Sequence, residues 1–367
     1  MKWETVEIGQ LGEVITGNTP PRKNPELYGD YIPFIKPTDM EIDRRYTPNP
    51  EECYSELGFE KYRNSLIPKG ATCVVTIGSI GKKMTQAYCD CFINQAVNAV
   101  IPNENYDKDF VYYLLKNNLD KVKGLDSGTS SGRENVSKSA FSSIEVKVVN
   151  HLPTQHKIAS ILSAYDDLIE NNLKRIKLLE EKAFLRYIKI VSEESMVIEA
   201  KLENLILPIK KKIKIPKTDY KENAEYPIVD QSTDFIGGYT NEKEAVYEDV
   251  PIILFGDHTR VLKYINFPFA CGADGTQLIK PANEKVSIAY LYFELISCNL
   301  SNYHYARHFK FLKEQVIKLP SEKVMNTYRE ETDKIFRLMQ LLRLQNTKLR
   351  EARNILLPKL MNGQIEV

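Results

Sequence analysis

The chain is poor in the residues from which metal and redox sites are built. It has six cysteines, five histidines and one tryptophan in 367 residues. The closest cysteines, Cys89 and Cys91, are separated by one residue, whereas zinc sites space paired cysteines by two or more residues and need a second pair. We therefore expect no metal site and free thiols, as in a reducing cytoplasm. No secretory signal is expected, because Met1-Lys2-Trp3-Glu4 leads into polar sequence.

Long apolar runs and an excess of one charge are also lacking. No run approaches the length of a membrane span, so no membrane association is expected. The formal net charge is only +1, which does not favour nucleic acid as a partner unless positive charge gathers on one face or partner subunits supply it. The one basic run, Lys210 to Lys217, is interpreted as a solvated loop or as a contact to a DNA backbone.

Motifs for catalysis are scarce. The segment from Gly78 to Lys83 lacks the spacing of a phosphate-binding P-loop, and no dinucleotide fingerprint or adenine-methyltransferase motif is present. His304 and His308 lie four residues apart without the glutamate of a metalloprotease helix. Asp257 beside His258 resembles half of an acid–base pair, but no nucleophile elbow accompanies it. We expect a protein without catalysis, and we keep a stand-alone hydrolase or nuclease that uses Asp257 and the histidines as an alternative.

What the sequence does contain is a repeat. A strand-rich block that ends in Pro153 is followed by a long amphipathic segment, and the same order recurs around Pro320. Strand and helix patterns recur in order and spacing, although identity between the halves is low; the alternative is two unrelated α+β domains. The predicted divisions are a globular block, a helix, a second block, and a second helix with a C-terminal tail, at residues 1–152, 153–192, 193–320 and 321–367.

Both long segments carry apolar residues at alternating spacings of three and four, the period of a coiled-coil seam. Thirty-seven helical residues would make a rod of roughly 55 Å. We expect the two helices to pair antiparallel; the alternative is that each packs on its own domain. Pro358 is expected to end or kink the second helix. The predicted seam consists of Ile158, Leu162, Tyr165, Ile169, Asn172, Ile176, Leu179, Ile335, Met339, Leu342, Asn346, Leu349 and Leu356.

Several strings, taken together, resemble a known family. In the first half they are Ile15-Thr-Gly-Asn-Thr-Pro20, Thr76-Ile-Gly-Ser-Ile-Gly-Lys82, Ile93-Asn-Gln-Ala-Val-Asn98 and Pro153-Thr-Gln-His-Lys-Ile-Ala-Ser-Ile-Leu162. In the second half they are Leu254-Phe-Gly-Asp-His-Thr-Arg260 and Arg353-Asn-Ile-Leu-Leu-Pro-Lys-Leu-Met-Asn-Gly363. In this order they resemble the specificity subunit of Type I restriction-modification systems. Ser321 to Val324 departs from the family's usual start of the second helix.

The resemblance implies an α+β protein with a pseudo-two-fold internal repeat: two mixed α/β target-recognition domains separated by two long antiparallel coiled-coil helices. It implies binding of double-stranded DNA at a bipartite, asymmetric site, without catalysis. Methylation subunits, two of them, would dock on the helices, and restriction subunits would join the complex. S-adenosylmethionine, ATP and Mg would be held by those partners, so this chain would bind no cofactor. A helical scaffold without DNA remains a further alternative.

Arginine and lysine suit guanine, asparagine and glutamine suit adenine, and hydroxyls suit either. Polar side chains of these types gather between the predicted strands, and most are expected to touch phosphate rather than bases. The candidates in the first half are Ser79, Lys82, Lys83, Ser131, Arg133 and Asn135, and those in the second half are His258, Thr259, Arg260, Lys263, Tyr303, His304, Arg307 and His308.

Overall fold

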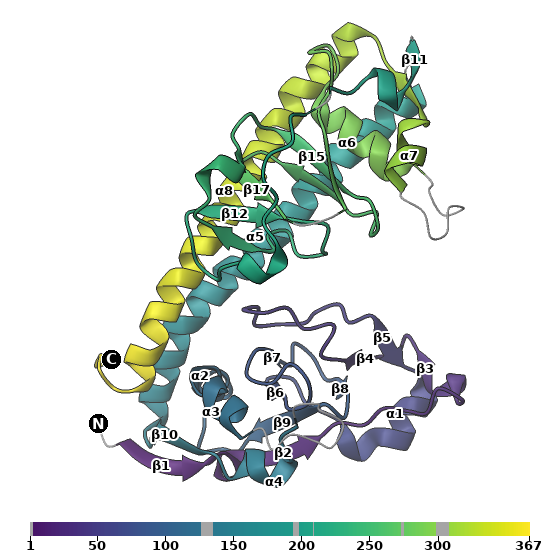
Figure 1. Ribbon diagram of the computed structural model, residues 1–367. Coiled ribbons are helices and arrows are strands. Elements are labelled where there is room, and N and C mark those ends of the chain that lie inside the picture. Colours follow the sequence, from purple (N-terminus) through teal and green to yellow (C-terminus); the bar gives the residue numbers. More distant parts are fainter. Residues whose placement is uncertain (1–2, 126–134, 194–197, 208, 273–274, 299–307) are drawn as a thin grey trace. The chain divides into compact units, whose positions relative to one another are not determined.

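The computed structural model describes residues 3–125, 135–193, 198–207, 209–272, 275–298 and 308–367. The chain divides into two compact units, residues 1–171 with 346–367 and residues 172–345. Two long helices, α5 (Leu152–Glu193) and α8 (Glu322–Met361), contribute a part to each unit. Each unit is therefore a strand-rich block packed on two helix segments, and the two are described in turn (Figure 1).

The first unit holds two four-stranded sheets and one two-stranded pair. The pair is β1·β10, and the sheets run β2-β9-β6-β7 and β3-β5-β4-β8. The strands are β1 (Trp3–Glu7), β2 (Gly12–Thr16), β3 (Tyr28–Gly29), β4 (Ile32–Ile35), β5 (Glu52–Tyr54), β6 (Thr72–Val75), β7 (Met84–Gln86), β8 (Phe92–Ile93), β9 (Val97–Pro102) and β10 (Glu145–Val149). The helices are α1 (Glu56–Tyr62), α2 (Lys108–Asn117), α3 (Leu119–Gly124) and α4 (Lys138–Ser142).

The second unit is built from the pair β11·β19 and sheets of order β16-β15-β18 and β13-β12-β17-β14. Its strands are β11 (Ile198–Lys201), β12 (Tyr226–Val229), β13 (Gly238–Thr240), β14 (Val246–Tyr247), β15 (Ile252–Gly256), β16 (Leu262–Ile265), β17 (Phe269–Cys271), β18 (Thr276–Ile279) and β19 (Val316–Leu319). Its helices, besides the two long ones, are α6 (Ile288–Ser297) and α7 (His308–Lys313).

The repeat expected from the sequence is present in the strand pairings. Each unit's first strand pairs antiparallel with the strand that precedes its long helix, β1 with β10 and β11 with β19. The central strands β6 and β15 pair antiparallel with β9 and β18. Among the named strands of the described residues, each unit has one parallel pair, β4 with β8 and β12 with β17. These pairings have the same order and direction in both units. The units therefore share this part of their topology although their sequence identity is low.

A capped, largely buried helix follows the same strand in both units. Asp107 accepts a hydrogen bond from the backbone N–H of Phe110 (2.8 Å) and begins α2, and Ser287 begins α6 in the same way. Such caps satisfy backbone donors that the first turn of a helix leaves unpaired. Residues 110–115 of α2 are all buried and form the centre of the first unit's core, together with Ile158, Leu162, Leu357 and Leu360 of the long helices.

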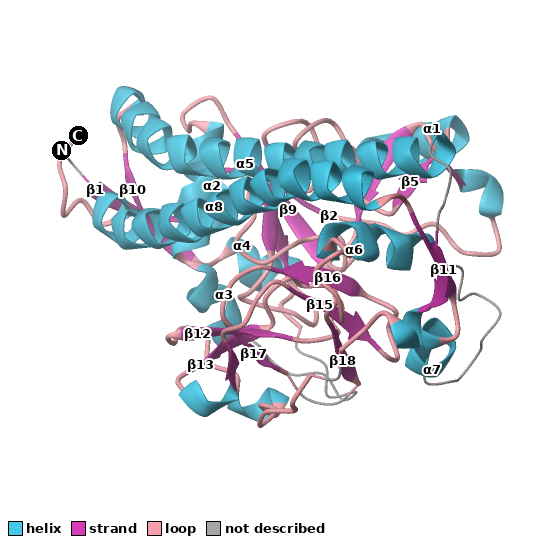
Figure 2. Cartoon of the chain, turned by 90° about the horizontal axis from the view of Figure 1, so that it is seen from above, coloured by secondary structure: helices cyan, strands magenta, loops and turns pink. Residues whose placement is uncertain are grey.

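The segments of α5 and α8 run antiparallel in each unit and lie side by side (Figure 2). In the first unit the Asn346 amide lies against the Ile169 carbonyl, and in the second the Tyr328 hydroxyl donates to the Ala183 carbonyl (3.2 Å). Residue numbers thus fall along one helix as they rise along the other. Buried apolar residues fill the contact, so these helices pair with each other as well as packing on their own domains.

Parts of the helix prediction need correction. Tyr165 is half-buried, and its neighbour Asp166 takes the buried position because it has a buried cationic partner in Arg353. Leu179, Ile335, Leu349 and Leu356 are also half-buried, whereas the other predicted seam residues are buried. Of the two outcomes predicted for Pro358, an end or a kink, the end is wrong, because α8 continues to Met361. Proline has no backbone N–H, so α8 loses one hydrogen bond at Pro358. The helix ends three residues later, so few further hydrogen bonds are affected.

Candidate nucleic-acid interface

In the first unit the predicted residues gather around the loop between β6 and β7. Ser79 and Lys82 are exposed, whereas Lys83 is half-buried and its Nζ donates to the Pro37 carbonyl (3.0 Å). Gly78 and Gly81 have φ of 87° and 71°, a region that favours glycine. The loop is thus a tight turn, and Asn135 reaches it through a β-bridge to Ile77. The candidates Ser131 and Arg133 lie outside the described residues.

A second polar loop beside it was missed by the sequence analysis. Asn94 and Gln95 follow β8, and their side chains meet Thr19, which follows β2. The backbone N–H of Thr76 donates to the Ala96 carbonyl (2.9 Å), so this loop adjoins the loop that carries Ser79 and Lys82. The Asn-Gln pair stood inside one of the strings that carry the family resemblance, and this was the signal that could have found it.

Glycine 17 allows these segments to approach one another. A Cβ on Gly17 would lie 2.1 Å from the Ile93 carbonyl oxygen and 2.4 Å from that of Asn94, which is closer than any side chain tolerates. The Gly17 N–H donates to the Val97 carbonyl (3.1 Å), and the Asn18 N–H donates to that of Ile93 (2.9 Å). The sequence therefore fixes residues 17–19 against residues 93–97.

In the second unit the predicted residues lie on the hairpin between β15 and β16. His258, Thr259 and Arg260 are exposed at its tip. Thr259 Oγ1 donates to the Gln231 carbonyl (2.8 Å), and Arg260 has a φ of 61°, which is uncommon for a residue with a side chain. The tip is thereby held in one conformation with polar groups outward. The candidates Tyr303, His304 and Arg307 lie outside the described residues.

Two candidates in the second unit are buried, and the prediction that they contact DNA is wrong for them. Lys263 is 4% exposed, and its ammonium group donates to the carbonyls of Asp230 and Asp234 inside the unit. His308 is also 4% exposed. Burial, followed by the nearby Arg260, lowers the pKa of His308, so its imidazole stays neutral and supplies no positive charge to a ligand.

Asp257 acts in the structure as part of a helix start. Its carboxylate accepts the backbone N–H of Phe309 (2.8 Å), and its carbonyl accepts that of His308 (3.2 Å). The carboxylate is buried, with 3% of the residue exposed. A capping carboxylate held in this way is not placed to activate a water molecule, which weighs against the hydrolase alternative. Among the described residues, no group of three or more His, Cys, Asp or Glu side chains could hold a metal ion.

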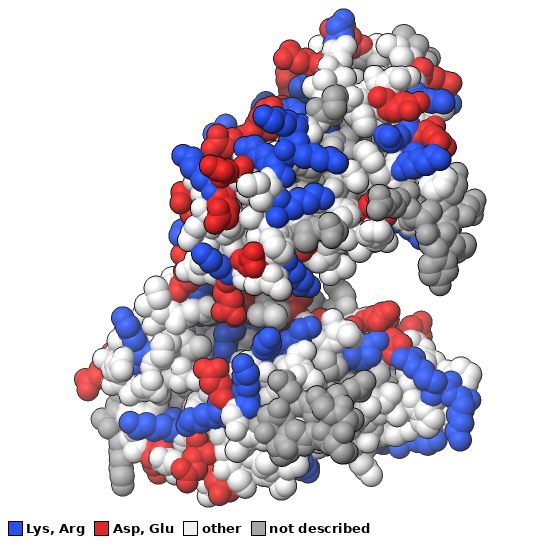
Figure 3. Space-filling view, in the orientation of Figure 1, with Lys and Arg blue, Asp and Glu red and all other residues white. Residues whose placement is uncertain are grey.

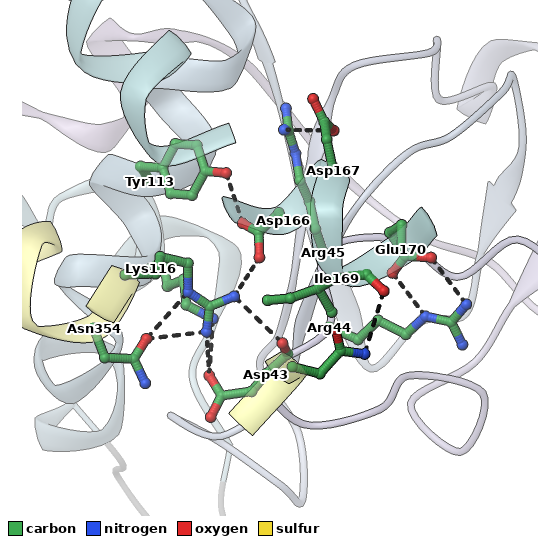
Figure 4. A network of polar contacts seen from close by, with 12 residues as sticks. Asp43, Arg44, Arg45, Tyr113, Lys116, Asp166, Asp167, Ile169, Glu170 and Asn354 are labelled. Carbon is green, nitrogen blue, oxygen red and sulfur yellow. Dashed lines mark hydrogen bonds and ion pairs between the residues drawn. The ribbon is translucent and has the colours of Figure 1, made fainter. Parts of the chain in front are cut away.

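A buried polar network ties the strand-rich block of the first unit to both long helices (Figure 4). Arg353 of α8 pairs with Asp166 of α5, which also accepts the Tyr113 hydroxyl of α2 (2.6 Å). Arg353 reaches Asp43 as well (3.1 Å), and Asp43 pairs with Lys116 (3.0 Å). The network therefore joins the segment around Asp43, α2, α5 and α8 at one point.

The network governs the ionisation of Asp43. Burial by itself would raise the pKa of this carboxyl, but the charges of Lys116 and Arg353 outweigh burial and hold the pKa below its ordinary value of 3.8. The adjoining Arg44 binds Glu170 of α5 through two nitrogens, with Nε–Oε1 at 2.9 Å and Nη2–Oε2 at 3.1 Å. Such forked arginine pairs orient both partners, so the loop at 43–44 has a fixed place on the helix.

The outer sides of the long helices expose apolar side chains. Leu178, Leu185, Leu341 and Leu344 are each more than half exposed. Lysines, arginines and acidic residues are interspersed over each unit on the face drawn in Figure 3, so that face is not uniformly basic. No described helix is both long enough and apolar enough to cross a membrane.

Comparisons with known proteins agree with this arrangement. The family model described as the Type I restriction modification DNA specificity domain matches residues 1–181. The specificity subunit of the Type I restriction enzyme MjaIX of Methanocaldococcus jannaschii is 24% identical over 411 residues, which cover 100% of this chain and 94% of that protein. The HindI specificity subunit of Haemophilus influenzae is 30% identical over 189 residues, 50% of this chain and 40% of that protein.

A solved structure shares the fold. The crystal structure of the Type I restriction-modification system S subunit from M. genitalium superposes with a TM-score of 0.57 at 17% identity, covering 98% of this chain and 96% of that one. At this identity the likeness concerns the fold, and it extends over both strand-rich blocks and both long helices.

Proposed function

Because this chain belongs to the family of Type I restriction-modification specificity subunits, which recognise DNA sequence, we propose that it reads a bipartite, asymmetric site with one recognition domain on each half. The observation that carries the proposal is the repeated topology. Several strand pairings of one block recur in the other, so the loop after the central strand occupies the same place in both blocks. The domain limits 1–152 and 193–320 stay predictions.

The two half-sites should differ, because the corresponding loops differ in chemistry. After the central strand, the first block presents Ser79 and Lys82 between two glycines, and the second presents His258, Thr259 and Arg260. Base recognition depends on which donors and acceptors reach the groove. Unlike loops on a common scaffold therefore suit unlike DNA sequences, and we assign the paired helices the role of spacer between the domains.

We further propose that methylation subunits, two in number, dock on the long helices. Leu178 and Leu185 of α5 and Leu341 and Leu344 of α8 support this assignment, because several large apolar side chains are exposed on this one helix pair and a partner that covered them would bury apolar surface. The chain would have no catalytic activity, and restriction subunits would complete the assembly in the cytoplasm. S-adenosylmethionine, ATP and Mg would be bound by the partner subunits.

The test is selection of bound DNA from a random library by the full chain assembled with its methylation subunit. The expected result is one split motif, two short specified segments separated by a gap of constant length. Binding without sequence preference at moderate salt would overturn the proposal, since phosphate contacts alone give salt-sensitive, sequence-independent binding. A chain that held its partner subunit but bound no DNA would be a helical scaffold instead.

A further inference from the structure

Three side chains in the first unit form a relay of hydrogen bonds that ends at the surface. The backbone N–H of Ala96 donates to Asn94 Oδ1 (2.7 Å). Asn94 Nδ2 donates to Thr19 Oγ1 (3.1 Å), and the Thr19 hydroxyl donates to Gln95 Oε1. Asn94 and Thr19 are half-buried, whereas Gln95 is exposed. The relay thus runs from the main chain to one exposed carboxamide.

The structure gives each hydrogen bond of the relay one direction, beginning at the backbone N–H of Ala96. A backbone N–H can only donate, so the Asn94 atom that it meets is the oxygen, and the Asn94 amino group faces Thr19. In the structure the Thr19 oxygen accepts from Asn94, and the single hydroxyl proton is donated to Gln95 Oε1. The Gln95 oxygen is therefore the inward atom of its carboxamide, and the amino group is the outward one.

This polarity restricts what Gln95 recognises. A glutamine reads adenine through its oxygen and its amino group together, and here the oxygen faces inward and already accepts a hydrogen bond from Thr19. The outward group offers N–H donors only, which complement a partner that only accepts hydrogen bonds. Phosphate oxygens are such partners, and they receive half to two-thirds of the hydrogen bonds between proteins and DNA.

We propose that Gln95 is a DNA-positioning residue that donates to a backbone phosphate of the first half-site, held in that orientation by Asn94 and Thr19. The inference rests on the proposed function. The place of the loop supports it: Ala96 accepts the backbone N–H of Thr76, at the start of the loop that exposes Lys82. A neutral donor and a cation in adjoining loops suit one stretch of DNA backbone.

The test compares the full chain with Gln95→Glu and Gln95→Ala, each assembled with the methylation subunit. Gln95→Glu replaces the donors by a carboxylate of nearly the same shape and should weaken DNA binding roughly tenfold to hundredfold, the range for hydrogen bonds to charged groups. The loss should be equal for all sequences, with an unchanged selected motif. Gln364→Glu, an exposed site in the same unit, adds the same charge and should leave affinity within about twofold.

Salt dependence separates this contact from that of a cation. Gln95→Ala should lower affinity without changing the slope of affinity against salt, because no charge is removed, whereas Lys82→Gln should reduce that slope by about one. Thr19→Val should weaken binding in the wild-type chain but have no further effect when Gln95 is already alanine, and Thr19→Ser should restore binding.

The outcomes are distinguishable. If Gln95→Glu changes the selected motif at one position, Gln95 reads a base, such as the acceptor edge of guanine, and the proposal is overturned. Unchanged affinity with an unchanged motif also overturns it while leaving the proposed function intact. If the wild-type complex itself selects no motif, the proposed function fails first.

Discussion

Arg353 shows how one side chain can decide whether a unit holds together. Arg353 is 0% exposed, and its guanidinium group pairs with Asp166, which is 1% exposed, and with Asp43. A buried ion pair adds little relative to an apolar replacement of both partners, but removal of one partner leaves an uncompensated charge in the interior. The three residues come from separate parts of the chain, so this network acts only in the folded unit.

Arg353→Met should therefore lower the free energy of unfolding of the first unit by about 3–5 kcal/mol, since it leaves Asp166 in the interior without its cationic partner. Trp3, the one tryptophan, lies in this unit against Gly363, so denaturation followed by its fluorescence reports the first unit. Lys359→Met, an exposed site on the same helix and in the same unit, should change stability by less than about 0.5 kcal/mol. Equal effects of the two variants would contradict the role given to the network.

Asp43 should make the stability of the first unit depend on pH. Its folded-state pKa is depressed by Lys116 and Arg353, against the effect of burial. The stabilisation is therefore full above the ordinary value of 3.8 and is lost as pH falls through the lower folded-state value. Asp43→Asn, which tolerates the same left-handed backbone (φ 61°), removes that contribution.

The stability difference between wild type and Asp43→Asn should thus be largest near neutral pH and shrink on acidification. Trp3 fluorescence during urea unfolding at a series of pH values measures it. Asp30→Asn, at an exposed site of the same unit, serves as the matched control and should follow the wild type. A difference that stayed constant with pH would show that Asp43 does not act through its charge.

Among the elements, the paired helices present two surfaces of different composition. Their facing sides are buried and hold residues such as Ala183, Tyr328 and Met339 at less than 1% exposure. Their outer sides carry leucines that the described residues leave exposed. A helix that only supported its own unit would place charged residues there, because such positions face water.

Leu178→Lys combined with Leu341→Lys should leave the fold intact and weaken binding of the methylation subunit about tenfold or more, as expected when apolar anchors are removed from an interface. Lysine and leucine have similar helix propensities, so the helices should persist. Leu57→Lys, a similarly exposed leucine in α1, is the control. Titration with the purified methylation subunit measures the affinity of the double variant and of the control. Unaltered binding by the double variant would show that these leucines are not part of the docking surface.

For the whole molecule, the repeated topology predicts that the recognition blocks are interchangeable. Replacement of residues 197–320 by the second block of another specificity subunit should change one half of the recognised motif and leave the other half and the gap unchanged. Mapping of methylated adenines in cells that carry each version measures this outcome. Changes in both halves would show that the two blocks do not read DNA independently.

Much of the fold could be predicted from the sequence because its signals are local. The 3-4 spacing of apolar residues located both long helices, and the order and spacing of strand and helix patterns revealed the repeat. The same spacing could not choose between Tyr165 and Asp166 for the buried position. That choice depended on Arg353, which is remote in sequence.

The candidate surface was less predictable, because residue type does not tell whether a polar group faces water or an internal partner. Lys263 was expected to bind DNA and is instead bonded inside the second unit, whereas Gln95 was overlooked and is exposed.

The sequence by itself thus determined the element order and the family resemblance, because both depend on residues that are close together in the chain. Which polar groups remain available to a ligand was settled by packing, because strand register brings residues 17–19 against residues 93–97 and only that contact turns the Gln95 amino group outward.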